Sequence, residues 1–163
     1  MASRELTAGE RDIAGEVFGG SVDCGRVRVH DRRWLPLLQP RDSGMAPLGR
    51  LYMHGAFWRE DYSACTLGLR AVFVHELTHV WQWQTGVCVP LMAGAWQMVR
   101  TGFRYGRAYA YEADPGKDLL DYNLEQQARI VEDWYAGRRG GAMTAVLRRF
   151  LEDPAYPRAG GPR

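Results

Sequence analysis

The stretch FVHELTHVWQWQTG, residues 73–86, places two histidines four positions apart, with a glutamate directly after the first. On an α-helix, residues four apart lie one above the other on the same face. His75 and His79 can therefore each point an imidazole nitrogen at one metal ion. Glu76 is rotated by about 100° from His75, so it would lie beside the ion, where it can accept a proton from a bound water molecule. This His-Glu-x-x-His arrangement is typical of zinc-dependent hydrolysis.

The residues around the motif predict a buried helix from about residue 66 to residue 84. Apolar residues recur there at steps of three and four, and Gly86 is suited to end the helix. These apolar residues are Leu69, Val72, Val74, Leu77, Val80 and Trp81. The alternative to a metal site is a core helix whose two histidines bond to neighbouring groups. The two interpretations differ in one requirement: a metal site needs at least one more ligand besides the two histidines, whereas a core helix does not.

A catalytic zinc ion usually has three protein ligands and one open position. The glycine and histidine that extend the motif in metzincins are replaced here by Gln82 and Thr85. His30 and His54 precede the motif in strand-like stretches, where a structural role is the more common one. A carboxylate downstream of the motif is the better candidate. Those available are Glu112, Asp114, Asp118, Asp121, Glu125, Glu132 and Asp133.

Glu125 stands out among these carboxylates because it lies in the first turn of a predicted helix. Asn123 caps that helix, with Gln126 at its third position, and the helix runs to about Tyr135. A glutamate from a second helix facing the first completes the site of the gluzincin class. A carboxylate in the first turn also interacts favourably with the helix dipole. Composition alone leaves these two interpretations close.

The N-terminal half of the chain predicts one helix and two strands. Thr7 and Glu10 have the spacing of a capping box, and a short helix that follows would end at Gly19-Gly20. The alternation in GRVRVH (25–30) predicts a half-buried strand, and GRLYMHG (49–55) predicts a second. The prolines and glycines of residues 36–49 indicate a loop.

The C-terminal half predicts further helices, one starting at Pro90 and a last one over AMTAVLRRFLED (142–153). Residues 105–122 between them have the composition of a linker. We expect residues 1–153 to form one domain and residues 154–163, PAYPRAGGPR, to form a disordered tail.

The composition excludes several classes of protein. A hydrophobic content of 46%, with six tryptophans and eight tyrosines in 163 residues, is that of a globular domain. The net charge of +2 is too small to indicate nucleic-acid binding, and the longest apolar stretch, 88–99, is too short to span a bilayer. The three cysteines form no CxxC pair, so a disulfide framework is not expected and a reducing compartment fits best.

Four segments together carry a family likeness. HELTHVWQWQ (75–84), preceded by FGGSVDCGRVRVHD (18–31) and by GRLYMHG, resembles the zinc metallopeptidase domain found with contractile injection systems. YAYEADPGKDLLDYNLEQQARIVEDW (109–134) is similar to a branch of that family called Vgr-related proteins, associated with type VI secretion. The resemblance covers about residues 14–135.

This resemblance implies an α+β, zincin-like fold that is mainly helical, with a small β-sheet whose edge strand flanks the motif helix. It implies Zn²⁺ bound by His75 and His79, with Glu76 as general base and Glu125 as third ligand. One departure is that the separation of His79 from Glu125 is far longer than in thermolysin-like gluzincins.

The expected activity is that of a zinc metallopeptidase acting on a peptide or protein through zinc-bound water. GRLYMHG would be the edge strand that pairs with an extended substrate. Gln82 lies three residues after His79 and is a candidate for orienting a ligand, although a surface polar role is equally compatible. Tyr109, Tyr111 and Tyr122 are candidates for stabilising the oxyanion, and each is equally well explained as a packed tyrosine.

The alternative function is a non-catalytic accessory or adaptor of a secretion apparatus, in which the zinc site is vestigial or structural. VgrG-like components of the apparatus are the expected partners in either case. The N-terminus, MASRELTAGERDIAG, lacks the apolar region of a secretory signal. We therefore expect the protein to be made in the cytoplasm of a bacterium, with export as an effector by a signal-independent system left open.

Overall fold

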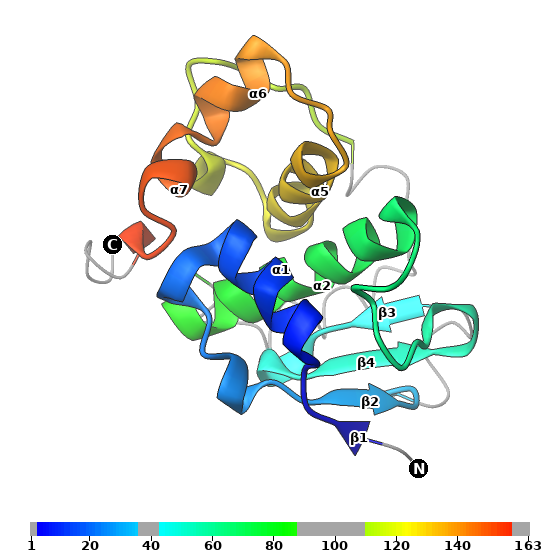
Figure 1. Ribbon diagram of the computed structural model, residues 1–163. Helices are drawn as coiled ribbons and strands as arrows, with labels where there is room; N and C mark the ends of the chain where they lie inside the picture. Colours follow the sequence, from blue (N-terminus) through cyan, green and yellow to red (C-terminus); the bar gives the residue numbers. More distant parts are fainter. Residues whose placement is uncertain (1–2, 36–42, 88–109, 158–163) are drawn as a thin grey trace.

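The computed structural model describes residues 3–35, 43–87 and 110–157. In this part of the chain, helices cover one side of a small four-stranded sheet (Figure 1). The order of the strands is β1-β2-β4-β3. The pair β2–β4 is parallel, whereas β1 and β3 run antiparallel to their neighbours. The strands are β1 Ser3–Arg4, β2 Val29–Asp31, β3 Ser43–Met45 and β4 Leu51–His54.

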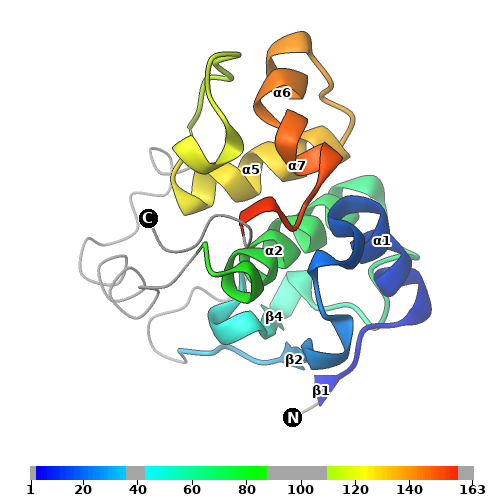
Figure 2. The ribbon, with the colours of Figure 1, turned by 90° about the vertical axis from the view of Figure 1, so that its left-hand side faces the viewer.

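Helix α2, Leu67–Thr85, carries the His-Glu-x-x-His motif and lies between the sheet and helices α5, α6 and α7, with α1 beside it (Figures 1 and 2). The expected helix is confirmed, and it ends at Gly86, whose φ of 80° is left-handed. Phe73, Leu77 and Trp81 are fully buried. Burial of this apolar side fixes the rotation of the helix, which decides where the histidines point.

Two other helices also begin where the sequence predicts. Helix α1, Ala8–Phe18, has the capping box of Thr7 and Glu10 and ends at Gly19, whose φ is 55°. Helix α5, Leu124–Tyr135, has a capping box in which the Asn123 side chain accepts from the Gln126 amide and the Gln126 side chain accepts from the Asn123 amide. Helices α2 and α5 pack against each other along the motif face.

The edge of the sheet differs from the prediction. GRLYMHG does form a strand, β4, but β4 is paired on both sides, with β2 and with β3. The edge strand next to α2 is β3, which lies in the segment expected to be a loop. A strand of three residues between glycines and prolines is too short to give a periodic signal. The first predicted strand is also shorter than expected, because Cys24–Arg26 forms a 3-10 turn before β2.

The C-terminal region departs from the prediction in two places. The single helix expected over 142–153 is divided at Leu147 into α6, Gly141–Val146, and α7, Arg148–Glu152. Residues 154–157, expected to be tail, pack on the core: the Trp81 indole Nε1 donates to the Pro154 carbonyl at 2.7 Å, and Tyr156 is buried. The helix expected from Pro90 lies outside the described residues. None of the helices described is long and apolar enough to cross a membrane.

A buried ion pair holds the N-terminal elements together. The fully buried Glu10 carboxylate of α1 accepts two bonds of 2.7 Å from the Arg4 guanidinium of β1. It also accepts from the backbone amides of Thr7 and Tyr62. This one carboxylate therefore joins the first strand, the first helix and the segment that leads into α2.

Replacing Glu10 with alanine is expected to lower the free energy of unfolding by about 3 kcal/mol, because the Arg4 charge loses its partner in a largely buried place. The matched control is Glu5→Ala, which removes an exposed carboxylate paired with Arg11 and Arg28 and should cost less than about 1 kcal/mol. Urea unfolding of both variants measures the difference. Equal losses would contradict this account.

Candidate metal centre

Helices α2 and α5 bring His75, His79 and Glu125 together, with one potential ligand atom of each residue within 4.8 Å of the others. Glu125 Oε2 lies 3.6 Å from His75 Nε2 and 3.5 Å from His79 Nε2. Ligands of a tetrahedral zinc ion at bond lengths of about 2.0–2.1 Å are themselves about 3.3–3.4 Å apart. The three atoms thus have the mutual spacing of zinc ligands, and this spacing is longer than that of a good hydrogen bond.

The other ring nitrogen of each histidine is held by a named partner. His75 Nδ1 donates to Glu132 Oε2 at 3.0 Å, and His79 Nδ1 donates to Gln82 Oε1 at 2.8 Å. The Gln82 amide cannot turn over, because its nitrogen already donates to the Leu124 carbonyl and to Gln127 Oε1. Placing both protons on Nδ1 leaves each Nε2 lone pair facing Glu125, as metal binding requires.

Glu125 Oε2 is the atom that a cation would satisfy. It is buried and accepts no hydrogen bond. A buried carboxylate oxygen without a partner is costly. A divalent ion at the point where the three atoms converge would remove that cost, so the donor set of two imidazoles and one carboxylate fits zinc.

Glu76 lies beside these residues, under the edge strand. Its side chain is buried, and its Oε2 atom has no hydrogen-bond partner. The backbone of Gly44 in β3 passes so close that a Cβ atom there would lie 2.6 Å from Glu76 Oε1. Glycine at position 44 therefore allows the strand to approach this carboxylate.

The charges of the site favour a cation. Burial acts to lower the pKa of His75, but the Glu125 and Glu132 carboxylates outweigh it and raise that pKa to about 10. Burial acts to raise the pKa of Glu125, yet His79 and His75 hold it below its ordinary value. Burial raises the pKa of Glu76. The carboxylates that favour a proton on His75 would equally favour a metal ion in place of that proton.

Gln82 makes the contact to His79 that its spacing suggested, and it is buried rather than on the surface. Glu132 is the residue whose role sequence reasoning missed. It lies seven residues after Glu125, two helical turns along the same face of α5. That spacing was a usable signal, because the helix face that places Glu125 against the motif helix can also place Glu132 against it, here at His75.

The tyrosine candidates have other partners in the structure. The Tyr111 hydroxyl donates to Asp133 Oδ2, and the Tyr122 hydroxyl donates to the Glu112 carbonyl and accepts from the Asp114 amide. These bonds hold residues 110–122 in place. Tyr109 lies outside the described residues. His30 stacks on Tyr52 in the sheet, and His54 Nδ1 lies 3.7 Å from Asp31, so neither belongs to the cluster.

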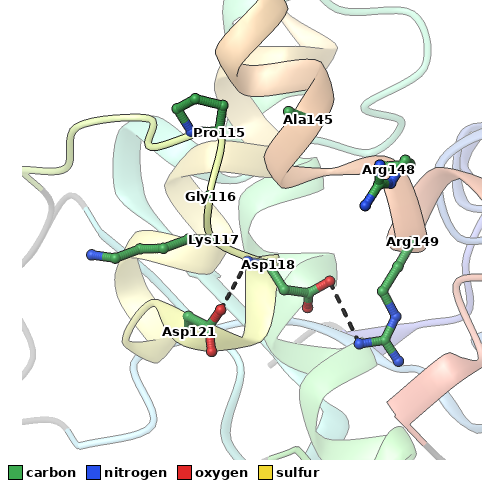
Figure 3. Close-up of a pocket in the computed structure, with 8 residues that line it drawn as sticks. All are labelled: Pro115, Gly116, Lys117, Asp118, Asp121, Ala145, Arg148 and Arg149. Atoms are coloured by element: carbon green, nitrogen blue, oxygen red, sulfur yellow. Dashed lines mark hydrogen bonds and ion pairs between the residues drawn. The ribbon is translucent and has the colours of Figure 1, made fainter.

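A hollow of about 220 Å³ lies between residues 115–121 and helices α6 and α7 (Figure 3). Two of the carboxylates considered above line it, Asp118 and Asp121. Asp118 forms an ion pair with Arg149 and accepts a hydrogen bond from the Tyr156 hydroxyl. The Asp121 carboxylate accepts a hydrogen bond from the Asp118 backbone amide (Figure 3). The hollow contains none of the cluster residues and supplies no ligand to them.

No protein-family model matches the chain. Over 151 residues the chain is 46% identical to the type VI secretion system spike protein VgrG2b of Pseudomonas aeruginosa. This alignment covers 91% of the chain and 14% of the spike protein. The solved effector domain of Pseudomonas aeruginosa VgrG2b is 40% identical, with a TM-score of 0.74 over 91% of this chain and 82% of that one. The chain thus belongs to the family of the VgrG2b effector domain.

Proposed function

We propose that the chain is a zinc-dependent peptidase of the zincin class that acts as an effector in type VI secretion. The observation that carries the proposal is the convergence of two imidazole nitrogens and an unsatisfied buried carboxylate oxygen at the mutual spacing of zinc ligands. The effector context is supported by the name of the related domain. A VgrG-like component is the expected partner for delivery.

Each group in the site has a distinct task under this proposal. His75, His79 and Glu125 would hold zinc, which acts as a Lewis acid and lowers the pKa of a bound water to about 7. Glu76 takes the proton of the attacking water on its carboxylate and delivers it to the nitrogen of the leaving amine. Its raised pKa suits the first step, because a weaker acid has a stronger conjugate base.

The edge strand supports a peptide as the substrate. In the described part of the sheet, β3 has no neighbour on its outer side, and Gly44 brings its backbone next to Glu76. A free strand edge offers amide and carbonyl groups to an extended chain. A peptide bound along β3 would therefore have its backbone beside the general base.

The rival function is an accessory protein with a structural zinc ion. Structural sites are normally closed by four protein ligands, often cysteines. In the described residues the cluster offers three ligands and contains no cysteine. A set of three ligands among the described residues, with the buried Glu76 carboxylate adjacent, favours a catalytic role.

Replacing Glu76 with glutamine is expected to keep stoichiometric zinc while lowering peptide hydrolysis by at least about a hundredfold, because only the proton-accepting oxygen is lost. Zinc content is measured by mass spectrometry of the metal, and hydrolysis by counting new N-termini in a proteome-derived peptide mixture.

Two controls accompany this experiment. Glu16→Gln, an exposed change on α1, should leave both readings unchanged, and His75→Ala/His79→Ala should lose zinc and activity together. If Glu76→Gln cleaves at the wild-type rate, Glu76 is not the base. If the wild type holds zinc and cuts no peptide, the accessory role is supported instead.

Glu132→Gln is expected to weaken zinc binding by about 10- to 100-fold, because His75 loses the carboxylate that fixes its tautomer and ring orientation. Competition with a chromogenic chelator measures the dissociation constant. The matched control is Glu112→Gln, which alters a carboxylate of the 110–122 segment and should leave zinc affinity unchanged. An equal loss in both variants would contradict the assignment.

A further inference from the structure

We infer that Trp83 and Leu48 form an apolar ledge, two helical turns along α2 from Glu76, that selects peptides with a large apolar residue about three positions before the cleaved bond. This inference rests on the proposed function, and it adds the substrate class that the site would accept. It is carried by the phase of helix α2, the backbone of the turn after β3 and the exposure of these two side chains.

The phase of α2 places Trp83 on the same face as the chemistry. Successive residues turn by about 100°, so Trp83, seven residues after Glu76, returns to within about 20° of it around the helix. Trp83 is also one turn beyond His79. The neighbouring residues Val80 and Trp81 belong to the core instead and are fully buried. Trp83 therefore lies on the helix face that carries Glu76, one turn beyond His79.

The turn between β3 and β4 lies directly on Trp83. A Cβ atom at Gly49 would be 2.9 Å from Trp83 Cδ1, and Gly49 has a φ of 73°. Leu48 beside it has a φ of 54°, which disfavours any residue with a side chain. Gly44 over Glu76 and Gly49 over Trp83 show that this segment follows α2 from the general base towards the tryptophan.

The Leu48 and Trp83 side chains are exposed, unlike most large apolar side chains in the described residues. Leu48 is 48% exposed and Trp83 is 37% exposed. In the described residues only Leu67 and Leu151 are comparable among large hydrophobic side chains, and they lie on α2's first turn and on α7. Contact with a ligand would explain why an exposed leucine is held in an unfavourable conformation one residue before Gly49, which lies against the Trp83 ring.

The reach of the ledge defines the substrate position. Seven residues of helix rise by about 10 Å, which equals about three residues of extended peptide. Because β3 runs from Glu76 towards Trp83, a peptide pairing antiparallel with it runs from Trp83 towards Glu76. The residue that meets the ledge is then on the amino side of the cleaved bond, and an apolar side chain is what Trp83 and Leu48 would bury.

The test is the cleavage profile of the zinc-loaded protein on a proteome-derived peptide mixture, with every cut bond identified by mass spectrometry. Wild type is expected to favour leucine, phenylalanine or methionine over aspartate about tenfold at the third position before the bond. Trp83→Ala should remove this preference and retain zinc. Leu48→Asn should also reduce it, and because asparagine tolerates a positive φ, its melting temperature should not fall.

Leu67→Ser, which changes an exposed apolar residue on the same helix away from the ledge, should leave the profile unchanged. Cleavage by wild type without an apolar preference, or an unchanged profile in Trp83→Ala and Leu48→Asn, would overturn the inference and leave the proposed peptidase standing. If zinc-loaded wild type cuts no peptide at all, the proposed function fails and the ledge fails with it.

Discussion

The structure depends on the packing of α5 against α2, because this contact sets the Glu125 carboxylate opposite two imidazole nitrogens. The Glu125 Oε2 atom is buried there, 3.6 and 3.5 Å from the two nitrogens, and accepts no hydrogen bond. Proteins rarely leave such groups unsatisfied. A cation bound at this place would satisfy the oxygen, which is the basis of the proposed zinc site.

The groups around the cluster reduce its freedom. Gln82 and Glu132 each fix one imidazole by its Nδ1 atom, and Gln82 is itself held by the first turn of α5. The same helix pair thus supplies the proposed ligands and the groups that orient them. Gly44 limits the space over Glu76 from the opposite side. A site built on two packed helices and a strand is more rigid than one built on loops.

Much of this arrangement could be predicted from the sequence, and the failures have a common cause. The motif helix, the cap at Asn123 and the choice of Glu125 follow from local periodicity, capping residues and resemblance. The edge strand β3 could not be predicted, because three residues carry no period and their pairing with β4 depends on contacts distant in sequence. Glu132 was overlooked for a similar reason: its role follows from the packing of two helices, although its spacing from Glu125 was visible.

The chain matches only a small part of the larger protein to which it is similar. It spans 14% of the spike protein to which it is similar and most of that protein's solved effector domain. Under the proposed function, this unit carries a hydrolytic centre and an adjacent surface for peptide selection, and the family relationship supports its delivery by a type VI system.

The most direct test of the central claim is a crystal structure of the zinc-loaded protein with anomalous diffraction recorded on both sides of the zinc absorption edge. The account predicts one zinc ion at about 2.0–2.2 Å from His75 Nε2, His79 Nε2 and a Glu125 oxygen, with its fourth position open to water. Zinc bound without Glu125, a fourth protein ligand closing the site, or no ion between α2 and α5 would contradict it.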